Sequence, residues 1–164
     1  GINRVEPSFI RTEADELTYH FHVYIRYEIE KQLIEGTISV SDIPDIWNAM
    51  YKQHLGVTVS DILKGCLQDI HWSHGSFGYF ATYSLGSLYA AQFYETMVKQ
   101  HPNLEQEIDN GDCNYILQWT RKNIHQYGRK YTSDQICNLA TGENLNPKHF
   151  FEYAKKKFSK IYGI

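Results

Sequence analysis

The chain has 164 residues, of which 42% are hydrophobic and 21% charged, so it can form a core and is not expected to be disordered. Its formal net charge is -3, and its lysines and arginines are scattered rather than clustered. This distribution lacks the basic patch of a nucleic-acid-binding protein, and no apolar run approaches the roughly 20 residues that cross a bilayer. Neither nucleic acid nor a membrane is an expected partner.

The first predicted helix runs from about residue 12 to residue 34, because apolar residues recur there every four positions. They are Leu17, Phe21, Ile25, Ile29 and Leu33. Thr12 with Asp15 resembles a capping box at the start of this helix, and Gly36 is placed to end it.

A second helix is predicted to begin at residues 41–44 and to stop at Gly56, with Ile46, Met50 and Tyr51 facing inward. A short helix at residues 60–64 follows and is broken by Gly65.

The second half of the chain also shows helical patterns separated by turn residues. Helices are predicted at residues 80–99, 115–125 and 133–141 and from Asn146 onward, with a short acidic turn at 104–109. Since no alternating strand pattern of convincing length occurs, we predict an all-α fold in which residues 1–164 form a single helical unit.

Two compositional features bear on location and partners. Cys66, Cys113 and Cys137 are widely spaced, which is typical of buried reduced thiols in a cytoplasmic protein. The 13 tyrosines favour either a polar internal cavity or a large subunit interface, because a buried tyrosine hydroxyl needs a partner.

The eight histidines raise the question of a metal site. His71 and His74 can share a helical face near Asp69, but a zinc site normally has three or four protein ligands. The spacing His-Glu-x-x-His does not occur in the sequence. We expect no metal bound to this chain alone, and an independent metal hydrolase would require Asp69, His71 and His74 to converge.

The segment Ile-Arg-Thr-Glu-Ala-Asp at residues 10–15 is the first of two polar segments. Arg11 and Asp15 are four positions apart and can pair at a helix start. A solvated surface pair with a cap is the simpler interpretation of this segment alone.

The second polar segment, residues 65–83, places Gln68, Asp69, His71 and Trp72 between glycines, with tyrosines following at helical spacing. The glycines permit close approach of a ligand to the backbone. A ligand site and a buried hydrogen-bonded turn both fit this pattern.

Both segments resemble motifs of the carboxypeptidase Taq (thermostable carboxypeptidase) family. Residues 10–15 are similar to its I/V-R-x-x-A-D motif, and residues 65–72 are similar to its G-x-x-Q-D-x-H-W motif. The resemblance implies a cytoplasmic, homodimeric, all-α metallocarboxypeptidase that removes residues one at a time from peptides with a free C-terminus. It also implies zinc or cobalt held by His-Glu-x-x-His and a downstream Glu, which are expected in an N-terminal portion upstream of Gly1. This chain is then the C-terminal portion and is expected to be inactive alone.

Such an enzyme must bind the substrate carboxylate and stabilise the tetrahedral oxyanion. Arg11 suits the carboxylate, because its planar fork can bind both oxygens. Candidates for the scissile carbonyl and its oxyanion are His71, Tyr79 and Tyr83. Gln68, Asp69 and Asp15 are candidates for the substrate-binding site as well, where they would hold the side chains that contact the substrate in place.

A non-catalytic helical interaction or dimerisation module is the alternative. It predicts that these polar residues scatter over the surface while the aromatic residues form one exposed patch. The enzyme hypothesis predicts that Arg11, His71 and Tyr83 face a common concavity.

Overall fold

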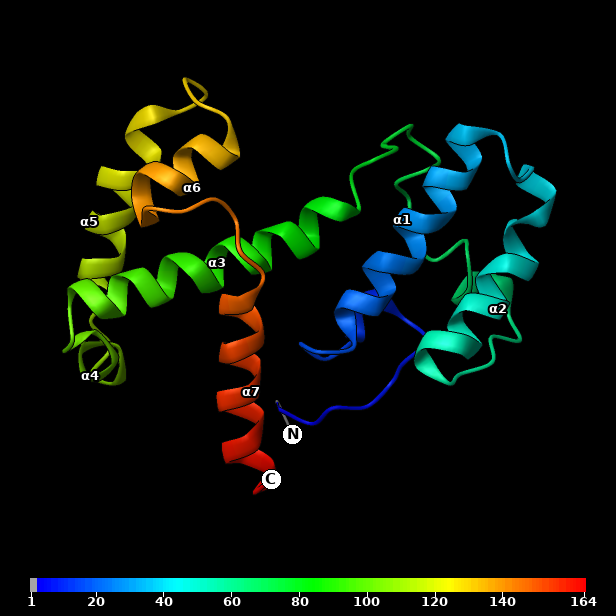
Figure 1. Cartoon of the computed structure of the whole chain (residues 1–164). Coiled ribbons are helices and arrows are strands. Elements are labelled where there is room, and N and C mark those ends of the chain that lie inside the picture. Colours follow the sequence, from blue (N-terminus) through cyan, green and yellow to red (C-terminus); the bar gives the residue numbers. More distant parts are fainter. Residues whose placement is uncertain (1–2) are drawn as a thin grey trace. The chain divides into compact units, whose positions relative to one another are not determined.

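The computed structural model describes residues 3–164, and within this range all regular structure is helical (Figure 1). The predicted all-α fold is confirmed. The chain forms two compact units, one extending to Ser84 and one from Leu85 onward, which we describe separately. That residues 1–164 act as one helical unit stays a prediction.

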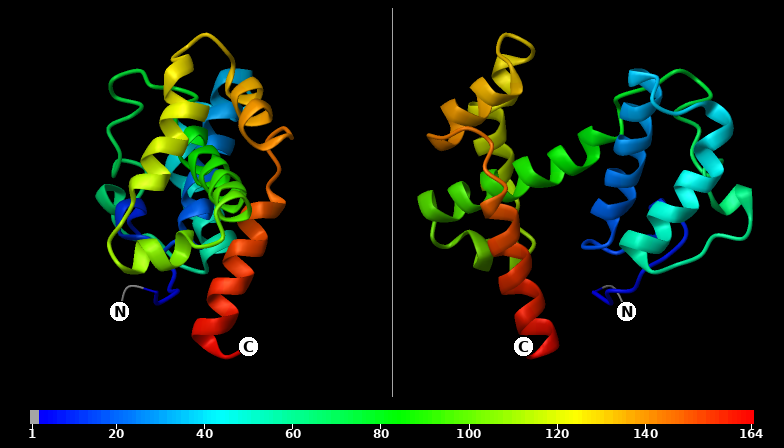
Figure 2. Two further views of the ribbon diagram at one scale, coloured as in Figure 1. Left: turned by 90° about the vertical axis from the view of Figure 1, so that its left-hand side faces the viewer. Right: turned by 45° about the vertical axis from the view of Figure 1, so that its right-hand side comes forward.

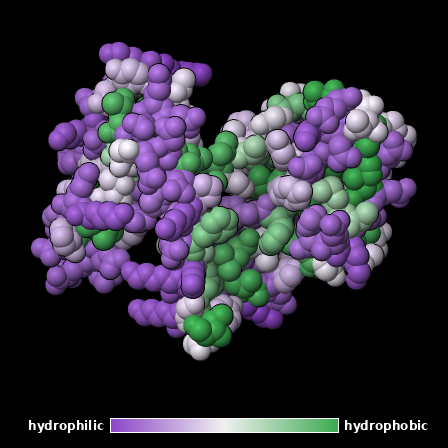
Figure 3. Space-filling view, in the orientation of Figure 1, coloured by the Kyte–Doolittle hydropathy of each residue, from purple (hydrophilic) through white to green (hydrophobic). Residues whose placement is uncertain are grey.

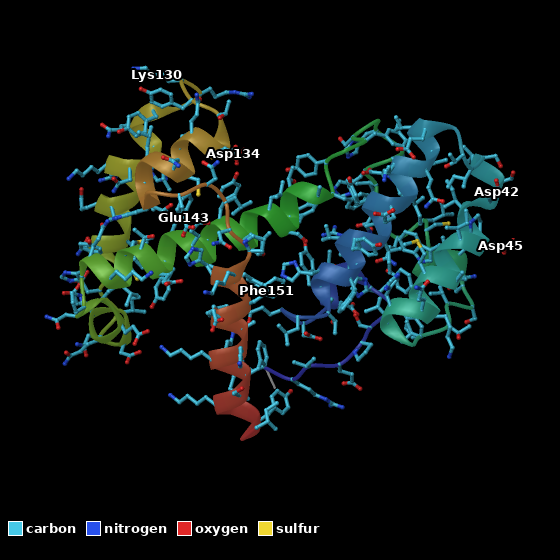
Figure 4. The ribbon with its side chains drawn as sticks, in the orientation of Figure 1. Asp42, Asp45, Lys130, Asp134, Glu143 and Phe151 are labelled. Atoms are coloured by element: carbon cyan, nitrogen blue, oxygen red, sulfur yellow. The ribbon has the colours of Figure 1, made fainter. Side chains whose placement is uncertain are left out.

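The first unit is built around two α-helices joined by short 3-10 turns. Its elements are η1 (Arg11–Glu13), α1 (Tyr19–Glu35), η2 (Val40–Asp42), α2 (Ile43–Leu55) and η3 (Ile62–Lys64). Helices α1 and α2 lie side by side (Figures 1 and 2). The acidic side chains Asp42 and Asp45 lie at the N-terminal end of α2 (Figure 4), where they complement the helix dipole.

Helix α1 begins at Tyr19, and the predicted start near Thr12 is wrong. The reason is local, because the Asp15 carboxylate accepts hydrogen bonds from the backbone N–H groups of Leu17 and Thr18 and holds a turn there. The predicted stop is confirmed: Gly36 adopts φ 70°, which favours glycine.

The core of the first unit comes mainly from α1 and α2. Its buried members are Ile25, Ile29, Ile43, Trp47, Tyr51, Leu55, Val59 and Cys66. The predicted inward positions are partly wrong: Phe21 is 44% exposed, and Ile46 and Met50 are only partly buried beside the core. The four-residue apolar repeat drifts around the helix, so polar residues of α1 take part of the buried face instead.

The second unit contains most of α3 (Ala81–Gln100) and all of the later helices. They are α4 (Leu104–Asp109), α5 (Asn114–Asn123), η4 (His125–Tyr127), α6 (Ser133–Thr141) and α7 (Lys148–Tyr162). The four predicted helices are confirmed, while the acidic turn at 104–109 is a helix. Met97, Leu104, Trp119 and Ala140 form the core that joins α3 to α6.

The caps of α6 show how local sequence sets helix ends. Thr132 and Gln135 exchange side-chain and backbone hydrogen bonds in a capping box, one residue before the predicted helix start at residue 133. Gly142 ends the helix with φ 87°. Cys66 and Cys137 are buried free thiols as predicted, whereas Cys113 is exposed, because it precedes α5 instead of facing a core.

Several large apolar side chains remain exposed on α7, including Phe151 at 65%. Figure 3 shows hydrophobic residues at the surface near the C-terminal end of this helix. Among residues 3–164, no helix combines the length and apolar character needed to cross a membrane.

Candidate functional site

Asp69 lies between two buried arginines that come from different parts of the first unit. Its Oδ1 accepts hydrogen bonds from Arg11 Nε at 3.1 Å and Nη2 at 2.8 Å. Its Oδ2 accepts one from Arg26 Nε at 2.7 Å, and Arg26 Nη2 makes an ion-pair contact at 2.6 Å without hydrogen-bond alignment. Arg26 is fully buried and Arg11 is 7% exposed. Both carboxylate oxygens are thus engaged.

This cluster keeps Asp69 ionised. Burial alone would raise the pKa of Asp69, but the charge of Arg26 and the hydrogen bonds from Arg11 and Arg26 together lower it. Two guanidinium groups and one carboxylate leave one positive charge uncompensated within this trio. The trio therefore favours an anion nearby.

Arg11 pairs with Asp69, so the predicted pair between Arg11 and Asp15 is wrong. Asp15 instead caps the chain before α1: its Oδ2 accepts from the Thr18 hydroxyl at 2.7 Å and from the Glu6 N–H at 3.0 Å. Burial would raise the pKa of Asp15, but these hydrogen bonds and those from the backbone of Thr18 and Leu17 lower it. Its contacts make Asp15 a local structural anchor.

Gln68 links the segment before α1 to the turn at residues 64–65 by hydrogen bonds. Its Oε1 accepts from the Arg11 N–H at 2.8 Å, and its Nε2 donates to Phe9 O at 3.0 Å and Lys64 O at 2.9 Å. The two motif segments, more than 50 residues apart in sequence, are therefore held together by Gln68 and Asp69.

His71 and Tyr83 form a direct hydrogen bond, with Nε2 and the hydroxyl 3.0 Å apart. Burial, and after it the charges of Arg11, His74 and Arg26, lower the pKa of His71, whereas the charge of Asp69 acts in the opposite direction. The net lowering of the pKa favours the neutral His71 ring. The guanidinium carbon of Arg11 lies 4.9 Å from the centre of the Tyr83 ring. Tyr79 is 49% exposed, and its ring packs 5.4 Å from that of Tyr83.

A pocket of about 380 Å³ opens beside this pair. It is lined by Ile70, His71, His74, Ser76, Tyr79 and Tyr83. Arg11 does not line the pocket but packs against the ring of Tyr83, which does. His71 and Tyr83 thus face a common pocket as predicted, but the prediction that Arg11 faces it too is wrong, because the Arg11 guanidinium turns to Asp69 and the Tyr83 ring. The three residues are still close together, rather than scattered as the interaction-module hypothesis predicts.

No group of three histidine, cysteine, aspartate or glutamate side chains capable of holding a metal occurs among residues 3–164. Asp69 is committed to its two arginines, and His74 Nδ1 lies 2.9 Å from the Ser76 hydroxyl. The convergence of Asp69, His71 and His74 that an independent metal hydrolase would require is not present in this part of the chain.

Comparison with known proteins agrees with this arrangement of motifs. The family model described as carboxypeptidase Taq (M32) metallopeptidase matches residues 1–158. The chain belongs to this metallopeptidase family. It is 43% identical to Carboxypeptidase 1 of Bacillus subtilis and 42% identical to Thermostable carboxypeptidase 1 of Thermus thermophilus, over 99% of the chain and 32% of each relative.

The helical fold is also that of the carboxypeptidase Taq family. The crystal structure of the M32 carboxypeptidase from Deinococcus radiodurans R1 superposes with a TM-score of 0.95 at 36% identity, covering 99% of this chain and 33% of that one. The chain therefore spans about a third of the length of the relatives that it matches.

Sequence reasoning missed three residues that build this site in the carboxypeptidase Taq chain: Arg26, Glu30 and Tyr51. The Tyr51 hydroxyl contacts His22 Nδ1 at 2.9 Å and Arg26 Nη1 at 3.3 Å, and all three residues are buried. Burial, with the nearby arginine charges, lowers the pKa of His22 to about 4. One pattern could have revealed Arg26 and Glu30, because the polar residues His22, Arg26 and Glu30 recur every four positions on α1.

Proposed function

We propose that this chain is part of a metal-dependent carboxypeptidase that releases amino acids one at a time from the free C-terminus of peptides. In this proposal the chain contributes residues that bind substrate and stabilise the oxyanion, and the metal ligands come from the other two thirds of the protein. The family membership and the names of the relatives support the activity.

The observation that carries the proposal is the hydrogen bond between His71 and Tyr83 at the edge of the pocket. When the neutral His71 ring carries its proton on Nε2, it donates to the Tyr83 oxygen. In this arrangement the Tyr83 hydroxyl would donate its hydrogen to the scissile carbonyl oxygen as negative charge develops on that oxygen. Tyr79, which lines the same pocket four residues earlier, is the second candidate for this role.

Arg11 is proposed to bind the substrate carboxylate. Three of its five N–H groups donate to Asp69 and Tyr19. The excess positive charge of the trio supports an anion at this position. Gln68 and Asp69 act through Arg11, which they contact directly, whereas Asp15 acts through the backbone on either side of it.

The metal is proposed to be zinc or cobalt, which would polarise the scissile carbonyl and activate the attacking water. The described residues of this chain do not offer a ligand set for it. We therefore assign its ligands to the rest of the protein and expect this chain alone to be inactive. A homodimer in the cytoplasm, with no nucleic-acid or membrane partner, is the assembly we propose.

The test is an assay of the purified full-length protein with a blocked dipeptide that has a free C-terminus. Release of the C-terminal amino acid should be lost with a chelator and restored by zinc or cobalt. The same peptide with an amidated C-terminus should be a far poorer substrate. Equal cleavage of both peptides, or no release from either with metal present, would contradict the proposal.

A further inference from the structure

Glu30 makes two hydrogen bonds from inside the first unit to the two ends of one loop. It lies on α1 and is 3% exposed. Its Oε1 accepts from the Trp72 indole Nε1 at 2.8 Å, and its Oε2 accepts from the Gly78 backbone N–H at 3.1 Å. Each carboxylate oxygen thus holds one end of the segment 72–78, which we name the pocket loop.

The pocket loop has no helix or strand of its own to fix its shape. It is held internally by the turn hydrogen bonds from Gly75 N to Trp72 O at 3.1 Å and from Ser76 N to His71 O at 2.9 Å. It carries His74 and Ser76, which line the pocket, and it connects His71 to the helix that bears Tyr83. The position of this loop therefore affects both partners of the hydrogen bond between His71 and Tyr83.

Burying the Glu30 carboxylate costs free energy, so a specific contact must account for its position inside the unit. Burial raises the pKa of Glu30, and the bonds from Trp72 and Gly78 only partly offset it. A neutral acceptor could serve one donor, but two donors approaching from separate sides require two acceptor oxygens. Only a carboxylate supplies both within one side chain.

We propose that Glu30 is a positioning residue that ties both ends of the pocket loop to α1 and so keeps His71 and Tyr83 in their hydrogen-bonded arrangement. Its effect on turnover rests on the function proposed above, whereas its effect on the loop does not. Glu30 touches neither the pocket nor the proposed oxyanion, so it acts only through the loop.

The decisive variant is Glu30→Gln in the full-length, metal-loaded protein. Gln has almost the same shape but one acceptor oxygen and one NH₂ group, so it faces at least one of the two donors with a donor of its own. Trp72→Phe is the complementary change, because it removes the indole N–H while keeping a ring between Trp47 and Phe80. Glu35→Gln is the matched control, since it makes the same change on an exposed position of α1.

Hydrogen exchange of the pocket loop is the first measurement. We expect Glu30→Gln to raise the exchange rate of residues 73–78 by about tenfold or more, as expected when a buried hydrogen bond to a charged group is lost, with α1 unchanged. The second measurement is turnover, for which we expect kcat to fall by about tenfold with KM nearly constant. Adding Trp72→Phe to Glu30→Gln should cause little further loss, because both act on the same loop.

Exchange in Glu30→Gln equal to that of Glu35→Gln would overturn the inference, as would faster exchange with unchanged kcat. The proposed function fails by a different result, namely full turnover in the Tyr83 and Tyr79 variants described below. In that case the exchange measurement alone decides whether Glu30 ties down the pocket loop.

Discussion

Arg26 Nε donates a hydrogen bond to Asp69 Oδ2 over 2.7 Å, although the two residues are 43 positions apart. Arg11 donates to the other oxygen of the same carboxylate. One side chain thus joins α1, the segment before it and the segment that leads to the pocket. The stability of the site and its charge both depend on Asp69.

Replacing Asp69 by Asn should therefore be strongly destabilising. It would leave two buried guanidinium groups without their carboxylate, and breaking a buried ion pair in this way costs about 3–5 kcal/mol of unfolding free energy. Urea unfolding of the variant measures this loss. Asp45→Asn, at an exposed position in the first turn of α2, is the control and should lose less than about 1 kcal/mol. Similar losses in the two variants would contradict the account.

The parts of the fold that depend on neighbours in sequence could be predicted from the sequence. Gly36, Gly56 and Gly142 end helices where expected, because a left-handed residue after the last turn is a local requirement. The motif positions Gln68 and His71 also lie at the site, since their segment is compact in sequence.

The partners of the buried charges could not be predicted in the same way. Asp15 was four residues from Arg11 and looked like its partner, but Asp15 instead accepts four local hydrogen bonds, from Glu6, Leu17 and Thr18. Arg11 pairs with the carboxylate of Asp69, which is 58 residues away, and only tertiary packing brings these two residues together. The burial of Arg26 could not be predicted for the same reason. Within an apparently amphipathic helix, an arginine is expected on the exposed face.

Arg11→Ala should discriminate between peptides by the state of their C-terminus. If Arg11 binds the substrate carboxylate, the variant should lose about 2–5 kcal/mol of transition-state stabilisation with a free C-terminus and little with an amidated one. The measurement is the ratio of kcat/KM for the two peptides. This ratio is insensitive to the loss of stability that follows from leaving Asp69 with one arginine, and an unchanged ratio would remove Arg11 from the proposed carboxylate site.

Deprotonation of His149 should make the second unit less stable as the pH rises. Its ring lies between Glu95 and Glu143, with Nε2 2.6 Å from Glu143 Oε1 (Figure 4 labels Glu143). Burial opposes protonation, but the hydrogen bonds to both carboxylates outweigh it and raise the pKa of His149. The stabilisation is therefore complete below the unfolded pKa of about 6.5 and is lost as pH rises through the higher folded pKa.

Urea unfolding of the parent protein and of His149→Gln at a series of pH values tests this sign. The difference in unfolding free energy should be largest near pH 6 and shrink toward pH 9. His125→Gln, at an exposed position in η4, should give no such trend. A difference that grows with pH would show that the ring is neutral in the folded protein.

The most direct test of the central claim is kcat of Tyr83→Phe in the full-length, metal-loaded enzyme. The account predicts that kcat falls by about 10²–10³ with KM nearly unchanged, as when other oxyanion donors are removed. Tyr79→Phe should then have a much smaller effect, and both variants should unfold at the parent's urea concentration, because neither loses much buried apolar volume. If kcat stays within a few-fold of the parent in both variants, the pair formed by His71 and Tyr83 has only a structural role.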